Sequence, residues 1–307
     1  MGTPDLAAVS LRSLISAGHE IAAVVTQPDK PKGRGKAMAY SAVKELAIQE
    51  NLPVLQPVKI KQDEEFFEEL KKINPDCIVV AAFGQMLPKA ILDLPKFGCI
   101  NVHASLLPKY RGAAPIQWVV INGEKEAGVT IMHMDVGCDT GDMIIKDQLT
   151  LDPKETAGSL HDKLAVLGGN LIVKALKMIE EGTAPREQQD ESQFTYFGML
   201  KKEDGKIDFN KSAVAIERLI RGLNPWPSAY TSMEGKGLKL WQADVIDGPK
   251  KGECGEILEV TKDSIVVQTG EGYLAITELQ LEGKKRMPVD AFIRGYEVNV
   301  GTKLGEA

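Results

Sequence analysis

Residues 62–83, QDEEFFEELKKINPDCIVVAAF, place a charged, helix-like segment directly before an apolar run. The first part concentrates acidic residues early and lysines late, which complements the helix dipole. The second part, residues 76–83, is short and almost continuously apolar, as expected for a parallel strand that is covered on both faces. A helix that leads into such a strand is typical of a βαβ unit. The stretch therefore predicts an α/β fold.

The same alternation of helix and strand extends in both directions. Apolar runs recur at residues 21–25 (IAAVV) and 98–102 (GCINV), and SAVKELAIQEN at residues 41–51 begins with a serine N-cap. Residues 128–137 and 142–150 are two further strands, and the turn signal CDTG between them favours an antiparallel pair. We therefore predict a Rossmann-like domain with a mixed sheet.

The start of the chain departs from this pattern. GTPD at residues 2–5 leads straight into a helix pattern from about Leu6, whereas a βαβ domain normally opens with a strand. The first strand of the sheet is therefore expected to be missing.

A second domain follows a long helix and a polar connection. Residues 155–182 have apolar side chains at spacings of three and four, which predict one helical face. The polar, aperiodic TAPREQQDES at residues 183–192 is typical of a linker. Beyond it come one helix, at residues 212–223, and short strands separated by Gly-rich turns, which predict a small β-barrel or sandwich. We divide the chain into an α/β domain at residues 1–182, a linker at 183–203 and a C-terminal domain at 204–307.

The composition is that of an ordinary soluble protein. Of 307 residues, 43% are hydrophobic and 26% charged, and the longest apolar run falls far short of the roughly 20 residues that cross a bilayer. The four cysteines are scattered without a CxxC pair, and the N-terminus resembles no secretory signal, so we expect reduced thiols in a cytoplasmic protein. The net charge of -6 argues against broad nucleic-acid binding. A net charge does not exclude nucleic-acid binding by local basic patches, and two basic clusters are present, KPKGRGK at residues 30–36 and GKKR at 283–286.

Polar side chains mark the end of the run at residues 98–102. Asn101 and His103 are two residues apart, so they share one face of a strand at its carboxyl end, where open α/β sheets bind ligands. Asp135, Asp139 and Asp142 supply carboxylates from the turn between the next two strands. Two plainer interpretations stay open: a core histidine bonded to a backbone carbonyl, and an Asx-turn. No metal site is predicted, because the spacing lacks both the terminal glutamate of a calcium loop and an HxxxH pair.

Asparagine, histidine and aspartate without an evident serine or cysteine nucleophile suggest that the substrate supplies its own nucleophile. Acyl transfer to an amine is such a reaction: the amine attacks a carbonyl, an oxyanion develops and a proton leaves the nitrogen. An amide and an imidazole can stabilise the oxyanion, and a carboxylate can orient the imidazole or accept the proton.

Two segments carry a family resemblance. NVHASLLPKYRGAAPIQ at residues 101–117 closely resembles the signature of the 10-formyltetrahydrofolate-dependent formyltransferases, and GVTIMHMDVGCDTGDMI at 128–144 resembles their second catalytic segment. GTPD, VVTQPDKPKGRGK, VVAAFGQMLPKAIL and NPWPSAY occur in the same order as in the members that formylate an initiator tRNA. The resemblance covers nearly the whole chain.

The resemblance implies a catalytic trio and a folate site. The trio falls on Asn101, His103 and Asp139, with the first two polarising the formyl oxygen and the aspartate assisting proton transfer. The expected contacts with the tetrahydrofolate co-substrate are Ser105, Leu106, Leu107 and Pro108, together with Phe83, Gly84, Gln85, Met86 and Leu87.

The resemblance also implies initiator methionyl-tRNA as the acceptor. Lys30, Lys32, Arg34 and Lys36 match a loop that engages the tRNA acceptor end, with Arg34 in the key position. Cations interleaved with Gly and Pro suit a phosphate-binding arm, although a merely solvated loop would have the same composition. The C-terminal domain is expected to be an OB-like barrel that assists tRNA binding. We expect a monomer that needs no metal and no membrane.

Several alternatives stay open. An amino-sugar formyltransferase and a formyltetrahydrofolate hydrolase share the fold, and a non-catalytic tRNA-binding protein or an inactive truncated product would share many residues. The family also carries an apolar strand before GTPD. Without it we expect two neighbouring strands with unpaired backbone groups and an open seam, at a cost of several kcal/mol.

Overall fold

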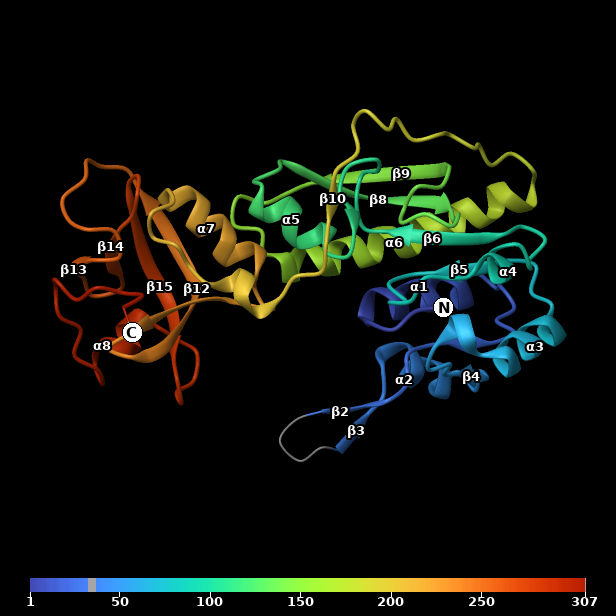
Figure 1. Cartoon of the computed structure of the whole chain (residues 1–307), viewed down its shortest axis with the longest axis horizontal. Coiled ribbons are helices and arrows are strands. Elements are labelled where there is room, and N and C mark those ends of the chain that lie inside the picture. The colour runs from blue at the N-terminus through green and yellow to red at the C-terminus, as the bar shows by residue number, and fades with distance from the viewer. Residues whose placement is uncertain (33–36, 307) are drawn as a thin grey trace. The chain divides into compact units, whose positions relative to one another are not determined.

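The computed structural model describes residues 1–32 and 37–306, which form two compact units (Figure 1). Unit 1 comprises Met1–Pro115, Glu126–Thr150 and His161–Phe197. Unit 2 comprises Ile116–Lys125, Leu151–Leu160 and Gly198–Ala307. The domain limits expected from the sequence, at residues 182 and 204, stay predictions.

Unit 1 is built on a mixed sheet. Its strands run in the order β5 (Ile78–Val80), β6 (Cys99–His103), β8 (Glu126–His133) and β9 (Met143–Thr150). The pair β5 and β6 is parallel, whereas β6 with β8 and β8 with β9 are antiparallel. A separate parallel pair joins β1 (Val24–Val25) to β4 (Val54–Leu55). The predicted α/β fold with a mixed sheet is therefore confirmed, although most strands are shorter than the apolar runs that predicted them.

The stretch at residues 62–83 forms the expected helix and strand. Helix α3 (Glu64–Ile73) begins after Asp63, whose side chain accepts a hydrogen bond from the Phe66 amide. It ends where Asn74 adopts a left-handed conformation with a φ of 49°. Phe66 and Leu70 then pack with β5 in one buried cluster. Acid at the start, lysine at the end and an apolar stripe thus produce the helix and attach it to the sheet.

Further helices cover this unit. They are α1 (Asp5–Ser16), α2 (Ala42–Gln49), α4 (Lys89–Leu92), and the part of α6 (Ala157–Glu180) that follows residue 160. Gly168 lets α6 approach the sheet closely, because a Cβ there would lie 2.9 Å from a methyl of Val102 on β6. The unit also contains two short antiparallel strands, β2 (Lys30–Lys32) and β3 (Ala37–Ala39). Two others, β7 (Arg111–Gly112) and β10 (Tyr196–Phe197), pair in parallel.

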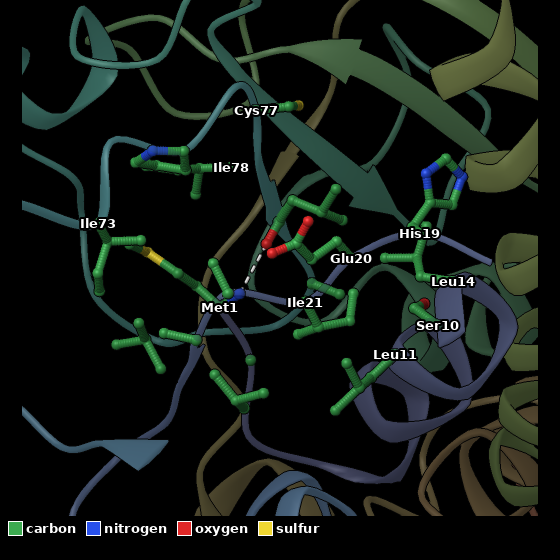
Figure 2. A pocket seen from close by; sticks show the side chains of 18 of the residues that line it. Met1, Ser10, Leu11, Leu14, His19, Glu20, Ile21, Ile73, Cys77 and Ile78 are labelled. Carbon is green, nitrogen blue, oxygen red and sulfur yellow. Dashed lines mark hydrogen bonds between the residues drawn. The ribbon is translucent and has the colours of Figure 1, made fainter. Parts of the chain in front are cut away.

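The first residues of the chain enter a gap between β1 and β5. The Met1 amine donates to the Val79 carbonyl at 2.7 Å, and the Ala81 amide donates to the Met1 carbonyl at 3.0 Å. On the other side, the Gly2 amide donates to the Val25 carbonyl at 2.9 Å. Beyond these contacts the gap is a cavity of about 420 Å³ (Figure 2). The open seam predicted from the sequence is therefore present.

Backbone groups on both sides face this cavity. The Ile78 amide donates to the Gly98 carbonyl next to β6, so the Val79 amide, one residue later, points away from β6. The amides of Val24 and Thr26 likewise bond to the β4 side, which turns the Val25 amide toward the gap. Leu14, Ile21 and Ile73 line the space with apolar side chains (Figure 2). The cavity thus has backbone hydrogen-bonding groups along both edges and apolar side chains around it, as the position of an additional strand would.

In a chain that begins at Met1, the free amine makes stability depend on pH. Burial lowers the pKa of this amine from 8.0 to about 6. Between those values the unfolded chain binds a proton that the folded chain does not, so the free energy of unfolding should fall by about 2 kcal/mol as the pH drops from 8 to 6. Urea titrations at both pH values test this. An N-terminally acetylated chain is the control, and an equal pH dependence in both chains would contradict the assignment.

Unit 2 is an antiparallel sheet with helices. Its ladder runs β11 (Ala229–Met233), β12 (Lys236–Ile246), β15 (Tyr273–Leu281), β14 (Ile265–Gln268) and β13 (Ile257–Val260), with β16 (Met287–Pro288) beside β15. Its helices are α7 (Ala213–Gly222), capped by the Ser212 hydroxyl, and α8 (Val289–Ile293). Unit 2 also holds much of α5 (Pro115–Ile121). The ladder does not close between β13 and β11 in the described residues, so only the antiparallel sheet is established.

A search of residues 1–32 and 37–306 finds no helix with the length and hydropathy of a membrane span.

Candidate active site

Asn101 and His103 lie at the carboxyl end of β6 on one face of the strand. Both are buried, with 8% and 6% of their surface exposed. Val80 of β5 pairs with Asn101, and Thr130 of β8 pairs with His103. Since strands on both sides fix the backbone, these side chains leave the sheet from a rigid position.

The two ring nitrogens of His103 have different surroundings. Nε2 lies 3.0 Å from the Tyr110 carbonyl, which can only accept, so Nε2 carries the hydrogen of this bond. Nδ1 faces the Asp139 carboxylate, with 3.7 Å between Nδ1 and Oδ1. This distance is too long for a direct hydrogen bond, yet it brings the carboxylate charge beside the ring. The plainer interpretation of His103 therefore holds in part, because this buried histidine does bond a backbone carbonyl.

The aspartates in the turn at residues 135–142 make different contacts. Asp135 makes an Asx-turn, in which its Oδ1 accepts from the Gly137 amide and the Thr140 hydroxyl. Asp139 has a left-handed backbone with a φ of 57°, and its Oδ2 accepts from the Gly112 amide at 2.8 Å. Of these, only Asp139 faces the imidazole. Among residues 1–32 and 37–306, no group of three His, Cys, Asp or Glu side chains is arranged to hold a metal ion.

Cys138 is the thiol nearest to this carboxylate. Its Sγ lies 3.7 Å from Asp139 Oδ2. Burial, followed by the negative charge of Asp139, raises the pKa of the Cys138 thiol. Because the thiolate is the nucleophilic form, this cysteine is held in its unreactive state. The geometry thus agrees with chemistry in which the nucleophile arrives with the substrate.

A side chain of β8 fixes the loop that follows β6. The Thr130 hydroxyl donates to the Ser105 carbonyl at 2.7 Å and accepts from the Leu107 amide at 3.1 Å. The Ser105 hydroxyl donates to the Lys109 carbonyl, and Leu107 is buried. Leu106 and Pro108 are half-buried, so they are the residues of this loop in the predicted folate contact that have accessible surface.

The second predicted folate segment follows β5. Phe83 and Leu87 are buried in the core, whereas Gly84 and Met86 are exposed. The Gln85 side chain accepts from the Ile60 amide at 2.9 Å. Because β5 and β6 are parallel neighbours, both folate segments leave the sheet at the same edge.

The predicted tRNA-binding residues lie mostly outside the described part of the chain. Lys30 is exposed at the start of β2. Arg34, Lys36 and the side chain of Lys32 are not among the described residues. The segment before them is anchored by Asp29, which pairs with Lys44 at 2.5 Å, and the Lys44 hydrogen bond holds the pKa of Asp29 below its usual range.

The structure adds two residues that the sequence did not single out. Arg111 is buried and donates through Nε and a terminal nitrogen to Gln189 Oε1, at 3.0 and 2.8 Å. Gln189 in turn donates to the Asp139 and Gly141 carbonyls, both at 2.8 Å. An arginine within the signature at residues 101–117 is a signal that could have been noticed. A glutamine within a polar stretch gives no such signal in the sequence.

The predicted linker is closely tied to this region. Its Tyr196 and Phe197 pair with Arg111 and Gly112. Gly112 has a φ of 103°, and a Cβ there would lie 2.2 Å from the Phe197 carbonyl oxygen, so the pairing requires glycine. The cavity beside Met1 is a different place, since none of Asn101, His103 and Asp139 lines it.

Models of two protein families match the chain. The model described as formyl transferase covers residues 1–176, and the one described as formyl transferase, C-terminal domain, covers residues 199–297. The methionyl-tRNA formyltransferase of Agathobacter rectalis is 57% identical over 98% of this chain and 97% of its own. The one from Clostridioides difficile is 54% identical over 99% of this chain and 98% of its own.

Solved structures agree on the fold. An N-formyltransferase from Helicobacter canadensis, solved with folinic acid and dTDP-3-aminofucose, has a TM-score of 0.67 at 21% identity and covers 93% of this chain and 97% of its own. HypX from Aquifex aeolicus, solved with tetrahydrofolic acid, has a TM-score of 0.58 at 18% identity and covers 84% of this chain and 47% of its own. With two family models in order along its length and relatives above 50% identity, the chain belongs to the formyl transferase family, among the methionyl-tRNA formyltransferases.

Proposed function

We propose that this chain transfers the formyl group of 10-formyltetrahydrofolate to the α-amino group of methionine on initiator tRNA, for the start of translation. The observation that carries the proposal is the pair formed by the buried His103 and the half-buried Asp139, which face each other beside Asn101 at the end of β6. The full-length relatives named methionyl-tRNA formyltransferase support the choice of acceptor.

Each residue of the site would have its own role in formyl transfer. The methionyl amine attacks the formyl carbon, so a C–N bond forms and the formyl oxygen gains negative charge. The Asn101 amide can donate to that oxygen, and so can His103 Nδ1 when it is protonated beside the Asp139 carboxylate. Asp139 accepts the proton that leaves the amine. The bond to N10 of the folate then breaks, and that nitrogen takes up a proton as tetrahydrofolate leaves.

Other elements would bind the two substrates. Ser105 to Pro108 and Phe83 to Leu87, at the shared edge of β5 and β6, would form the folate contact. Lys30, Lys32, Arg34 and Lys36 would contact phosphates of the tRNA acceptor end. The antiparallel sheet of unit 2 would act as an OB-like barrel that assists tRNA binding. The enzyme would work as a monomer in the cytoplasm, where charged initiator tRNA is made.

A comparison of acceptors tests the proposal. With 10-formyltetrahydrofolate as donor, methionyl initiator tRNA should be formylated at least about 100-fold faster than a nucleotide-linked amino sugar, because a site that binds a substrate through specific polar contacts strongly rejects analogues that lack them. Free tRNA without methionine is the control and should yield no product. A preference for the amino sugar, or release of formate at the same rate without acceptor, would show that the acceptor is misassigned.

A further inference from the structure

Gln189 lies between a buried arginine and the turn that carries Asp139. It is 8% exposed although it belongs to a polar stretch of sequence. Its Oε1 accepts two hydrogen bonds from Arg111, and this fixes which end of the side-chain amide faces the guanidinium. The remaining end, Nε2, therefore points in one direction, toward the turn.

Nε2 holds two backbone carbonyls of the turn. It donates to the Asp139 and Gly141 carbonyls, both at 2.8 Å. The backbone at Asp139 is left-handed, a conformation that costs free energy for residues other than glycine and therefore needs support from its surroundings. Gln189 provides that support on the main chain, while the Gly112 amide holds the Asp139 side chain.

Arg111 is fixed in turn by residues near Gln189. Its terminal nitrogens donate to the Glu191 carboxylate at 2.6 and 3.1 Å. The guanidinium holds the pKa of Glu191 below its usual range, so this partner stays charged at neutral pH. The chain from Glu191 through Arg111 and Gln189 to Asp139 is continuous, and all of its members lie in unit 1.

We propose that Gln189 is a positioning residue for formyl transfer, which orients Asp139 toward His103 by holding the backbone of residues 139–141. The proposal rests on the proposed function. Among the described residues, the side chain of Gln189 bonds to Arg111 and to the Asp139 turn and not to the imidazole or Asn101, so we expect its effect to pass through Asp139. Substrate binding by the folate segments should not depend on it.

Gln189→Glu is the sharpest test, because the shape of the side chain is unchanged. Glutamate can still pair with Arg111, but it places a carboxylate oxygen against two carbonyl oxygens where an N–H donor stood. Asp139 should then move away from Gly112 and His103. Gln193→Glu is the matched control, since Gln193 lies in the same segment and donates to Asp190 on the surface.

Two measurements test the effect of Gln189→Glu. The amide proton resonance of Gly112 reports its bond to the Asp139 carboxylate, and it should move upfield in Gln189→Glu and stay in place in Gln193→Glu. In the formylation assay, kcat of Gln189→Glu should fall about 10- to 100-fold, while KM for the folate changes less than about 2-fold. If Gln189→Glu does not fold, Gln189→Met, which removes the donor without repulsion, should show the same upfield movement and about a 10-fold loss of kcat.

The outcomes separate the two proposals. If the wild-type chain does not formylate methionyl-tRNA, the proposed function fails, and the Gly112 resonance still decides whether Gln189 positions Asp139. An unchanged resonance together with an unchanged kcat would overturn the positioning role. A fall in both kcat and folate binding with an unmoved resonance would overturn it too, because Gln189 would then act elsewhere.

Discussion

Asp139→Asn is expected to lower kcat for formyl transfer about 100- to 1,000-fold, with little change in KM for the folate. Asparagine has the same shape, tolerates the left-handed backbone at this position and can still accept from the Gly112 amide. The substitution therefore removes only the charge beside His103 and, with it, the proposed base for the amine proton. Steady-state kinetics with methionyl-tRNA and 10-formyltetrahydrofolate measure the effect.

Asp135→Asn is the matched control for this prediction. Asp135 lies in the same turn, but its carboxylate accepts from Gly137 and Thr140 and not from a residue of the site. Its turnover should stay within about 3-fold of the wild-type value, since an amide oxygen can accept the same bonds. If both variants lost activity equally, the turn as a whole would matter rather than the charge of Asp139.

The largest effect on stability is expected from filling the cavity beside Met1. Five apolar residues added before Met1 should extend as a strand between β1 and β5, pair with the amides of Val25 and Val79 and occupy part of the 420 Å³ space. The new hydrogen bonds and apolar burial should exceed the cost of ordering the segment, and raise the free energy of unfolding by about 3 kcal/mol. Urea denaturation at pH 8 measures this.

A Gly/Ser segment of equal length controls for the added residues and for the loss of the free amine at Met1. It can make the backbone bonds but buries almost no apolar surface, so its gain should be below about 1 kcal/mol. Equal stabilisation by the two segments would show that the cavity does not select an apolar strand.

Local patterns predicted the elements that make this fold. The acid-to-lysine gradient and apolar run of residues 62–83 gave α3 and β5, and the two-residue spacing of Asn101 and His103 placed both side chains on one face of β6. These predictions succeeded because helix and strand periods depend on neighbours in sequence. An open seam beside the start of the given sequence was also predicted, and the cavity beside Met1 lies at that position.

Contacts between distant segments could not be predicted in the same way. Nothing near Gln189 in sequence indicates that it bonds Arg111, which lies 78 residues away. The pairing of β7 with β10 depends on the close approach that Gly112 permits. Likewise, periodicity did not indicate that the Tyr110 carbonyl fixes the imidazole of His103. The elements of the site follow from local sequence, whereas its internal geometry follows from tertiary contacts.

The tie between Gln189 and the Asp139 turn has a consequence for recombination between related enzymes. Three pieces of chain, near residues 111, 139 and 189, depend on one another for their positions, because buried or partly buried hydrogen bonds join them. A chimera that imports the two signature segments of a homologue but keeps its own residues 183–197 would combine parts shaped for different neighbours. A crossover placed after residue 197, where unit 1 ends, transfers all three together and keeps the site intact.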